Sequence, residues 1–164
     1  MTFSKSANVY VGAENSGLYR LSAGSDRWES LSNGLPNLVE VQGIAVHPEN
    51  PDIVYAGTNN GPYRSSDRGN QWKRLDYPAG APGVWSFLFR PGDPSVMYLG
   101  TAPGEIYRST NSGDSWQKLS AIMGSNECQM TFPTRVIGLA ADPNFPDEMY
   151  AALEVAGVIR SADG

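Results

Sequence analysis

Residues 43–75 read GIAVHPENPDIVYAGTNNGPYRSSDRGNQWKRL, and the same order of residue types returns along the chain. Two further copies and a degenerate one are present: WSFLFRPGDPSVMYLGTAPGEIYRSTNSGDSWQKL (85–119), GLAADPNFPDEMYAALEVAGVIRSADG (138–164) and NVYVGAENSGLYRLSAGSDRWESL (8–31). A tryptophan recurs at a spacing of 44 residues, at Trp28, Trp72 and Trp116. A period of about 44 residues is typical of one four-stranded β-propeller blade.

Each complete copy contains four short stretches of strand-like composition. The first is apolar almost throughout, as a strand buried near a propeller axis would be, and covers Gly43–Val46, Trp85–Phe89 and Gly138–Ala141. The second carries an aromatic residue at the same point, Tyr55, Tyr98 or Tyr150, and the third covers Pro62–Ser65, Ile106–Ser109 and Val158–Ser161. The fourth begins at the tryptophan. Short loops rich in Gly, Asn, Pro and Asp separate the stretches, as antiparallel hairpins require, so we predict an all-β propeller.

The composition agrees with a single all-β domain. The chain has 164 residues, and its 18 Gly, 12 Pro, 8 Tyr and 4 Trp combine turn formers with strand formers. We interpret residues 1–164 as one propeller domain with about four blade units, at 1–31, 43–75, 85–119 and 137–164.

Charge and cysteine content exclude several classes of partner and site. A net charge of -5 gives no basic footprint for nucleic acid or an anionic membrane. No apolar run is long enough for a membrane span, and the start resembles no signal peptide, so we expect a soluble chain that is cytoplasmic by default. With one cysteine, Cys128, and one histidine, His47, we expect no intramolecular disulfide, no metal site and no cofactor.

A short motif lies between the third and fourth stretches. SSDRGNQW (65–72) returns as STNSGDSW (109–116), and SADG (161–164) begins a further copy. The motif resembles the Asp-box, or BNR, repeat S/T-x-D-x-G-x-x-W. In it an Asp side chain can accept backbone N–H bonds of its own turn, a Gly supplies positive φ, and the Trp packs over the hairpin. We expect such structural roles for Ser65, Asp67, Gly69, Trp72, Ser109, Asn111, Gly113, Trp116, Ser161 and Asp163, with Asn111 capping its turn through the amide oxygen.

Proteins that this chain resembles include sialidases, xyloglucan-active glycoside hydrolases, the sortilin luminal propeller, photosystem II assembly factors and YVTN/BNR-like repeat proteins. The group contains both enzymes and binders. We predict a non-catalytic scaffold that binds a protein or glycan, and the alternative is a glycoside hydrolase with paired carboxylates. A sialidase needs three arginines that converge on a substrate carboxylate. The arginines of this chain instead recur at one place in every copy, which indicates a scaffold role, so a sialidase is not favoured: Arg20, Arg64, Arg108 and Arg160.

The resemblance implies that the loops between strands two and three and between blades share one face, opposite the Asp-box turns. On that face we predict binding by Asn59, Asn60, Glu105, Glu127, Arg135 and Glu154, with Glu105, Glu127 and Glu154 as the carboxylates of the hydrolase alternative. The same loops carry Glu14, Asn15, Asp76, Tyr77, Trp85 and Asn126. The arginine spacing grows to 52 in the last unit, around the loop Ser120–Arg135. Long insertions in a regular scaffold often carry function.

The predicted strands leave the blades at both ends incomplete, with three strands in the first unit and three in the last. Propellers close with typically 4–8 complete blades. We therefore expect part of a longer propeller, and the alternative is self-association of two chains through the open blade edges.

Overall fold

The computed structural model describes residues 7–13, 16–78, 80, 82–120 and 133–164. In this part of the chain all regular structure is β, and no helix has the length and hydropathy that a membrane crossing requires. Fourteen strands follow one another: β1 (Val9–Ala13), β2 (Gly17–Leu21), β3 (Trp28–Ser30), β4 (Val41–Val46), β5 (Val54–Thr58), β6 (Gly61–Ser65), β7 (Lys73–Arg74), β8 (Gly83–Arg90), β9 (Asp93–Ala102), β10 (Ile106–Ser109), β11 (Gln117–Lys118), β12 (Val136–Ala141), β13 (Met149–Leu153) and β14 (Gly157–Ser161). The predicted all-β class is confirmed.

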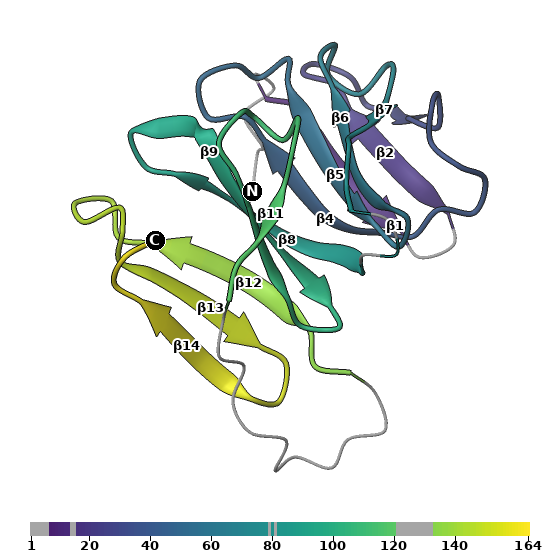
Figure 1. The fold of residues 1–164 in the computed structure, drawn as a ribbon. Coiled ribbons are helices and arrows are strands. Elements are labelled where there is room, and N and C mark those ends of the chain that lie inside the picture. The colour runs from purple at the N-terminus through teal and green to yellow at the C-terminus, as the bar shows by residue number, and fades with distance from the viewer. Residues whose placement is uncertain (1–6, 14–15, 79, 81, 121–132) are drawn as a thin grey trace.

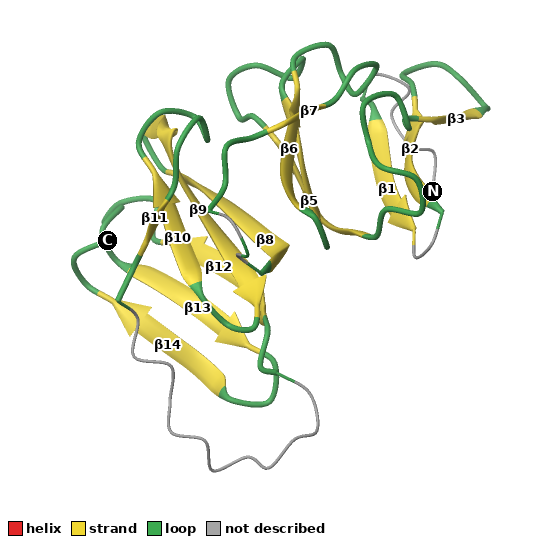
Figure 2. Cartoon of the chain, turned by 45° about the vertical axis from the view of Figure 1, so that its right-hand side comes forward, coloured by secondary structure: helices red, strands yellow, loops and turns green. Residues whose placement is uncertain are grey.

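The strands form four antiparallel sheets in chain order. Blade 1 is β1-β2-β3, blade 2 is β4-β5-β6-β7, blade 3 is β8-β9-β10-β11, and blade 4 is β12-β13-β14. At the inner side β1 contacts β4, β4 contacts β8, and β8 contacts β12. Figures 1 and 2 show the sheets following one another in an arc, with blades 1 and 4 at its two ends. Meander sheets packed around a common side in this way are the blades of a β-propeller.

The turns after β6 and β10 share one hydrogen-bond pattern. In the first, the Ser65 hydroxyl accepts the Gly69 N–H at 2.7 Å and donates to the Asp67 carboxylate, which accepts the Gln71 N–H at 2.9 Å. In the second, Ser109 and Asn111 hold the Gly113 and Ser115 N–H groups, each at 2.9 Å. In this second turn the Asn111 amide oxygen accepts a backbone N–H, as the Asp67 carboxylate does in the first.

The third turn begins in the same way. The hydroxyl of Ser161 donates to the carboxylate of Asp163 at 2.8 Å. The loop after β2 differs, because Leu21 and Ala23 stand at the positions of Ser65 and Asp67, and a backbone bond from Ser25 N–H to Ser22 O closes it. The predicted degeneration of this turn is therefore visible in its hydrogen bonds.

A tyrosine and an arginine of one blade hold the turn of the next. Tyr10 and Arg20 of blade 1 both donate to the carbonyl oxygen of Arg68, at 3.1 and 2.7 Å. At the next junction, Tyr55 and Arg64 donate to the carbonyl oxygen of Ser112, at 2.9 and 3.0 Å. The predicted scaffold role of the repeated arginines is thus explained at two junctions. We call this arrangement the Tyr–Arg clamp.

At the third junction the clamp is carried by the tyrosine. Tyr98 donates to the carbonyl oxygen of Gly164 at 2.9 Å. The guanidinium of Arg108 instead lies 5.9 Å from the Tyr98 ring centroid.

Burial is greatest in the second strand of each inner blade. Every residue of β5 is buried, whereas β4 and β12 each have one buried residue and their others are half-buried or exposed. The first strands, expected to be buried near the axis, are thus less buried than the second strands, because a second strand has a paired neighbour on both sides and packs between blades. The repeated aromatic residues are buried at Tyr55, Tyr98 and Trp72, whereas Trp28 and Tyr150, at the ends of the arc, are 50% and 39% exposed.

Candidate functional site

The candidate face lies at the end of the blades where the first strand of each blade begins and its second strand ends. Val41 pairs with Thr58, Gly83 with Ala102, and Val136 with Leu153. Antiparallel pairing at this end brings the loop that enters a blade beside the loop that leaves its second strand. The Glu154 N–H, for example, donates to the Arg135 carbonyl at 2.8 Å. The structure thus places the predicted loops on a common side of each blade.

A β-bulge recurs at this end of three blades. The register shifts between Val41 and Gly43, between Val84 and Ser86, and between Val136 and Gly138. The residues left without a partner are Gln42, Trp85 and Ile137. A bulge re-aims a side chain and often lies next to a functional site.

Trp85 belongs to a group of aromatic and charged side chains on this face. The Arg135 guanidinium lies over the indole at 4.4 Å from the ring centroid, within cation–π range. Arg135 also forms an ion pair with Glu154, with 3.2 Å between its Nη1 and the carboxylate. Residues from blades 3 and 4 therefore meet in one cluster of an aromatic, a cation and an anion.

Gln42 is the residue that the sequence argument missed. Its Oε1 is buried and has no hydrogen-bond partner among the described residues, and it lies beside Gly83 in the next blade. The copies carry Gln42, Trp85 and Ile137 at this position, so no residue type repeats there. In the sequence, Gln42 is marked only by its position directly before the first strand-like stretch of its copy, Gly43–Val46.

Glu105 lies in a separate network on the same side of blade 3. Its carboxylate accepts bonds from the Lys118 ammonium and from the Tyr107 hydroxyl, the latter at 2.6 Å. The hydrogen bond from Lys118 and then that from Tyr107 lower the pKa of Glu105. Burial and the hydrogen bond to Glu105 raise the pKa of Tyr107 to about 12. Glu105 therefore stays ionised at neutral pH.

The two asparagines differ in their contacts. Asn59 is tied to the segment that enters blade 2, because its N–H donates to Glu40 O at 3.3 Å and its Oδ1 accepts the Glu40 N–H at 3.4 Å. Asn60 is exposed, and its N–H donates to the Thr58 hydroxyl at 3.0 Å. Asn59 thus shapes the loop, and Asn60 faces solvent.

The remaining loop candidates have varied positions. Tyr77 is buried, and its hydroxyl donates to Pro82 O at 3.1 Å, while Asp76 is exposed. Glu14, Asn15, Asn126, Glu127 and Cys128 lie outside the described residues. The spacings Val84–Arg108 and Val136–Arg160 are equal, so the extra residues of the last unit precede Val136 and not the Glu154–Gly157 turn.

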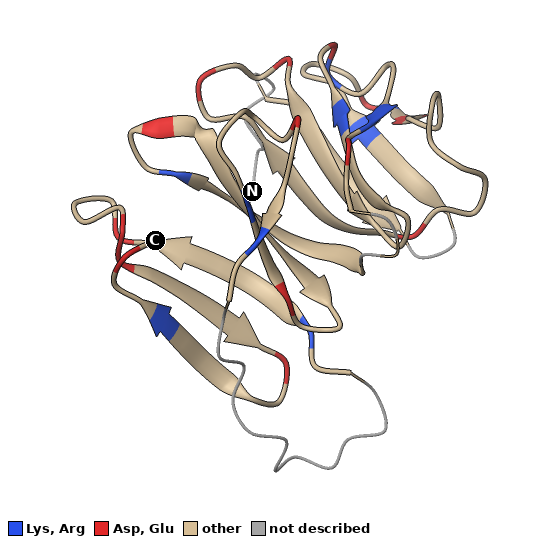
Figure 3. Cartoon of the chain, viewed as in Figure 1, with Lys and Arg blue, Asp and Glu red and all other residues tan. Residues whose placement is uncertain are grey.

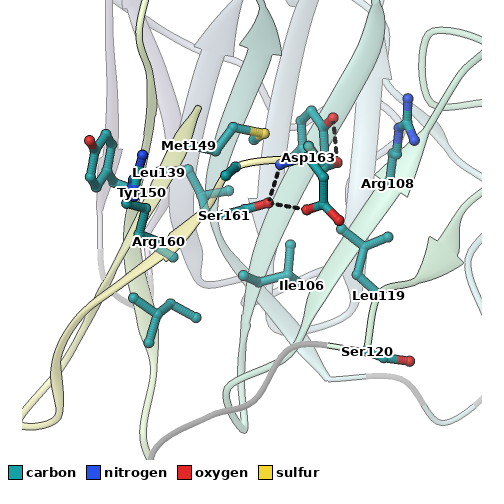
Figure 4. A pocket seen from close by; sticks show the side chains of 15 residues that line it. Ile106, Arg108, Leu119, Ser120, Leu139, Met149, Tyr150, Arg160, Ser161 and Asp163 are labelled. Carbon is teal, nitrogen blue, oxygen red and sulfur yellow. Dashed lines mark hydrogen bonds between the residues drawn. The ribbon is translucent and has the colours of Figure 1, made fainter. Parts of the chain in front are cut away.

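A cavity of about 760 Å³ lies between blades 3 and 4 and is lined by residues such as Ile106, Leu119, Leu139 and Met149 (Figure 4). At the first two junctions the equivalent positions pack around a tryptophan. Leu18 and Leu31 belong to the cluster of Trp72, and Leu75 to that of Trp116. We therefore assign this cavity to the packing between blades and not to a ligand.

Charged residues do not separate by sign over the fold. Figure 3 shows acidic and basic residues interspersed along loops and strand ends. Among the residues that the structure describes, no group of three or more His, Cys, Asp or Glu side chains is placed to hold a metal ion.

Curated relatives of this chain are xyloglucanases. The chain is 31% identical to the oligoxyloglucan-reducing end-specific xyloglucanase of Emericella nidulans over 76% of its own length and 17% of the relative's. It is 27% identical to a xyloglucanase of Paenibacillus over 69% of its length and 13% of the relative's. The chain thus spans less than a fifth of the length of these relatives. No family model matches it.

Solved structures share the fold. An ancestral GH74 enzyme superposes with a TM-score of 0.77 at 20% identity, covering 99% of this chain and 22% of that one. YCF48 from Cyanidioschyzon merolae gives 0.68 at 10% identity, covering 95% and 48%. YCF48 bound to D1 peptide gives 0.56 at 13% identity, covering 96% and 64%. The chain is a partial β-propeller of about four blades.

Proposed function

We propose that this chain is part of a glycan-binding propeller of the xyloglucanase type, and that the Trp85–Arg135–Glu154 cluster is one of its glycan contacts. The cluster carries the proposal because it joins a partly exposed indole to charged groups at the end where two blades meet. The curated relatives favour this hydrolase alternative over the non-catalytic scaffold predicted first. A protein ligand is supported only by the likeness in fold to YCF48 bound to D1 peptide.

The chemistry of the cluster suits a neutral polysaccharide. An aromatic ring offers a flat apolar surface to the C–H face of a sugar, and carboxylate and amide groups bind hydroxyls. Glu154 supplies a carboxylate through its ion pair with the Arg135 that lies over the indole, and Gln42 supplies an amide beside Gly83, two residues before Trp85. Binding sites of this kind combine apolar surface with a few well-placed polar groups.

Catalysis is a separate part of the proposal. A glycosidase needs two carboxyl groups, one of which has a raised pKa and acts as general acid. The lowered pKa of Glu105 does not suit that role. Within the hydrolase proposal, the catalytic candidates are therefore Glu154 and Glu127, with Glu105 as an ionised base or a positioning residue.

We also propose that the turns at 65–72 and 109–116 are Asp-box turns with a structural role. Their shared pattern of hydroxyl and carboxylate or amide bonds supports this assignment. The Tyr–Arg clamp of the preceding blade binds a carbonyl oxygen of each turn, so the turns also help to pack neighbouring blades together.

Binding is tested by affinity electrophoresis in gels that contain xyloglucan. We expect the chain to be retarded, and Trp85→Ala to weaken binding about tenfold or more, as loss of roughly 1.4 kcal/mol implies. The matched control is Phe145→Ala, an aromatic residue 69% exposed in the loop between β12 and β13. Equal retardation of both variants would contradict the assignment of Trp85.

Hydrolysis is tested by release of reducing sugar from xyloglucan. We expect Glu154→Gln or Glu127→Gln to abolish release and Glu105→Gln to reduce it, with thermal melts unchanged. Binding without release by the unaltered protein would refute the hydrolase part and restore the non-catalytic prediction.

A further inference from the structure

Strand β7 of blade 2 carries two positive charges that no acidic group neutralises. Lys73 and Arg74 are both exposed, and neither side chain forms a hydrogen bond or an ion pair with any residue that the structure describes. Most of the other described cations have an acidic partner, as Lys118 has in Glu105. In a chain with a net charge of -5, two neighbouring unpaired cations can attract an anion from outside the fold.

The residue that faces the repeated arginine differs between the blades. In blade 1 it is Glu29, which forms an ion pair with the arginine, and in blade 3 it is the neutral Gln117. In blade 2 it is Lys73, directly opposite Arg64. Like charges that face each other across a sheet are destabilising. Because violations of such local rules are expected at functional sites, this departure of blade 2 from the repeat points to a function.

A pocket of about 550 Å³ lies beside β7, between blade 2 and the turn of blade 3. Arg64 and Asp114 neutralise each other in its wall, with 2.9 Å between Nη2 and Oδ1. Of the other charged residues that line it, Lys73 and Arg74 outweigh Asp76 by one positive charge. Blades 2 and 3 are both four-stranded sheets inside the arc, so the pocket does not arise at an end of the chain.

The charges of this pocket favour a ligand with one carboxylate and several hydroxyl groups. A guanidinium such as that of Arg74 binds a carboxylate through two parallel N–H bonds, and the ammonium of Lys73 adds a further donor. Asp76 and Asp114, whose side chain is 61% exposed, can accept hydrogen bonds from hydroxyls. The same two carboxylates repel a phosphate dianion or a polyanion. A uronic acid, which is a sugar with a single carboxylate, combines the groups that fit.

We propose that Lys73 and Arg74 bind the carboxylate of a uronic acid. The two acidic side chains of the pocket then accept hydroxyl groups of the same sugar. A free sugar acid and a uronic acid unit of a polysaccharide offer the same chemistry. The site is separate from the cluster around Trp85, because β7 is the outermost strand of blade 2 and Trp85 lies in the first strand of blade 3. The inference therefore does not depend on the proposed glycan contact at Trp85.

Isothermal titration calorimetry with glucuronate at low ionic strength tests the proposal. We expect binding that weakens as salt is added, because the charges that attract the carboxylate are exposed. Arg74→Gln should raise the dissociation constant about tenfold or more. The matched control is Arg27→Gln, which removes an exposed arginine of blade 1 that does not line the pocket and should leave the dissociation constant unchanged.

Glucose and inorganic phosphate are the reference ligands. We expect both to bind more weakly than glucuronate, since glucose lacks the carboxylate and phosphate is repelled by the acids. Asp76→Asn should narrow the gap between phosphate and glucuronate. Absence of glucuronate binding, equal binding by Arg74→Gln, or tighter binding of phosphate than of glucuronate would each overturn the proposal.

Affinity electrophoresis identifies the source of the sugar acid. Retardation in gels that contain polygalacturonate, reduced in Arg74→Gln, supports a unit of a polysaccharide, whereas binding of glucuronate without retardation supports the free acid. In xyloglucan gels Arg74→Gln should migrate like the unaltered chain. Failure of the uronic acid site is thereby distinguished from failure of the contact at Trp85.

Discussion

The hydroxyl of Ser65 is the acceptor for two backbone N–H groups and a donor to Asp67, and the side chain is almost fully buried. Ser65→Ala leaves the buried Gly69 N–H without its partner, which costs about 1–3 kcal/mol. We expect the free energy of unfolding in urea to fall by that amount. Ser66→Ala, one residue on and exposed, should change it by less than about 0.5 kcal/mol. Equal effects would show that the turn is not held by the Ser65 hydroxyl.

Glu148 gives a pH dependence at the same scale. Hydrogen bonds from Arg160 and Tyr150 lower its pKa from 4.5 to about 2. A lowered pKa in the folded state stabilises the protein above the unfolded value and ceases to do so as the pH falls through the folded one. We expect the melting temperature of Glu148→Gln to lie below that of the unaltered chain at pH 7 and the gap to shrink below about pH 4.5. A gap that stays constant down to pH 3 would contradict the ion pair.

At the scale of elements, the spacing between blades is set by glycines in the second strands. A Cβ at Gly100 would lie 2.4 Å from Val136 Cγ1 and 2.5 Å from the Ser86 hydroxyl oxygen. Overpacking of this kind costs typically 1–3 kcal/mol, so Gly100→Ala should lower the denaturation midpoint clearly. Gly138→Ala is the control, because its Cβ would meet only the Ala152 Cβ, at 3.7 Å. Similar midpoints for both variants would mean that blades 3 and 4 move apart at little cost.

At the scale of the whole molecule, we expect hydrogen exchange of the backbone amides to be uneven along the chain. A row of repeats is stabilised by its neighbours, so the elements with a blade on both sides open last. We expect the amides of β5 and β9 to be the most protected in hydrogen exchange and those of β3 and β14 the least. Uniform protection along the chain would contradict this view of its stability.

Much of the fold could be predicted from the sequence, because each strand and turn depends on local residue types. The period of the tryptophans, the stretches around Tyr55 and Tyr98, and the Ser–Asp–Gly turns specify hairpins within about ten residues of themselves. The bulges were not predictable. Gln42, Trp85 and Ile137 share no chemistry, and only strand pairing shows that the three are left without a partner.

By itself, the sequence determined the all-β class, the number and order of the strands and the turns that hold them, since these follow from short-range preferences repeated along the chain. Tertiary structure alone decided which groups meet across blades: the Tyr–Arg clamp, the stacking of Arg135 on Trp85, and the engagement of Glu105 by Lys118. These contacts join residues from different strands and mostly from different blades. Their partners are fixed by how sheets pack, and that packing depends on shape and burial in three dimensions and not on neighbours in the chain.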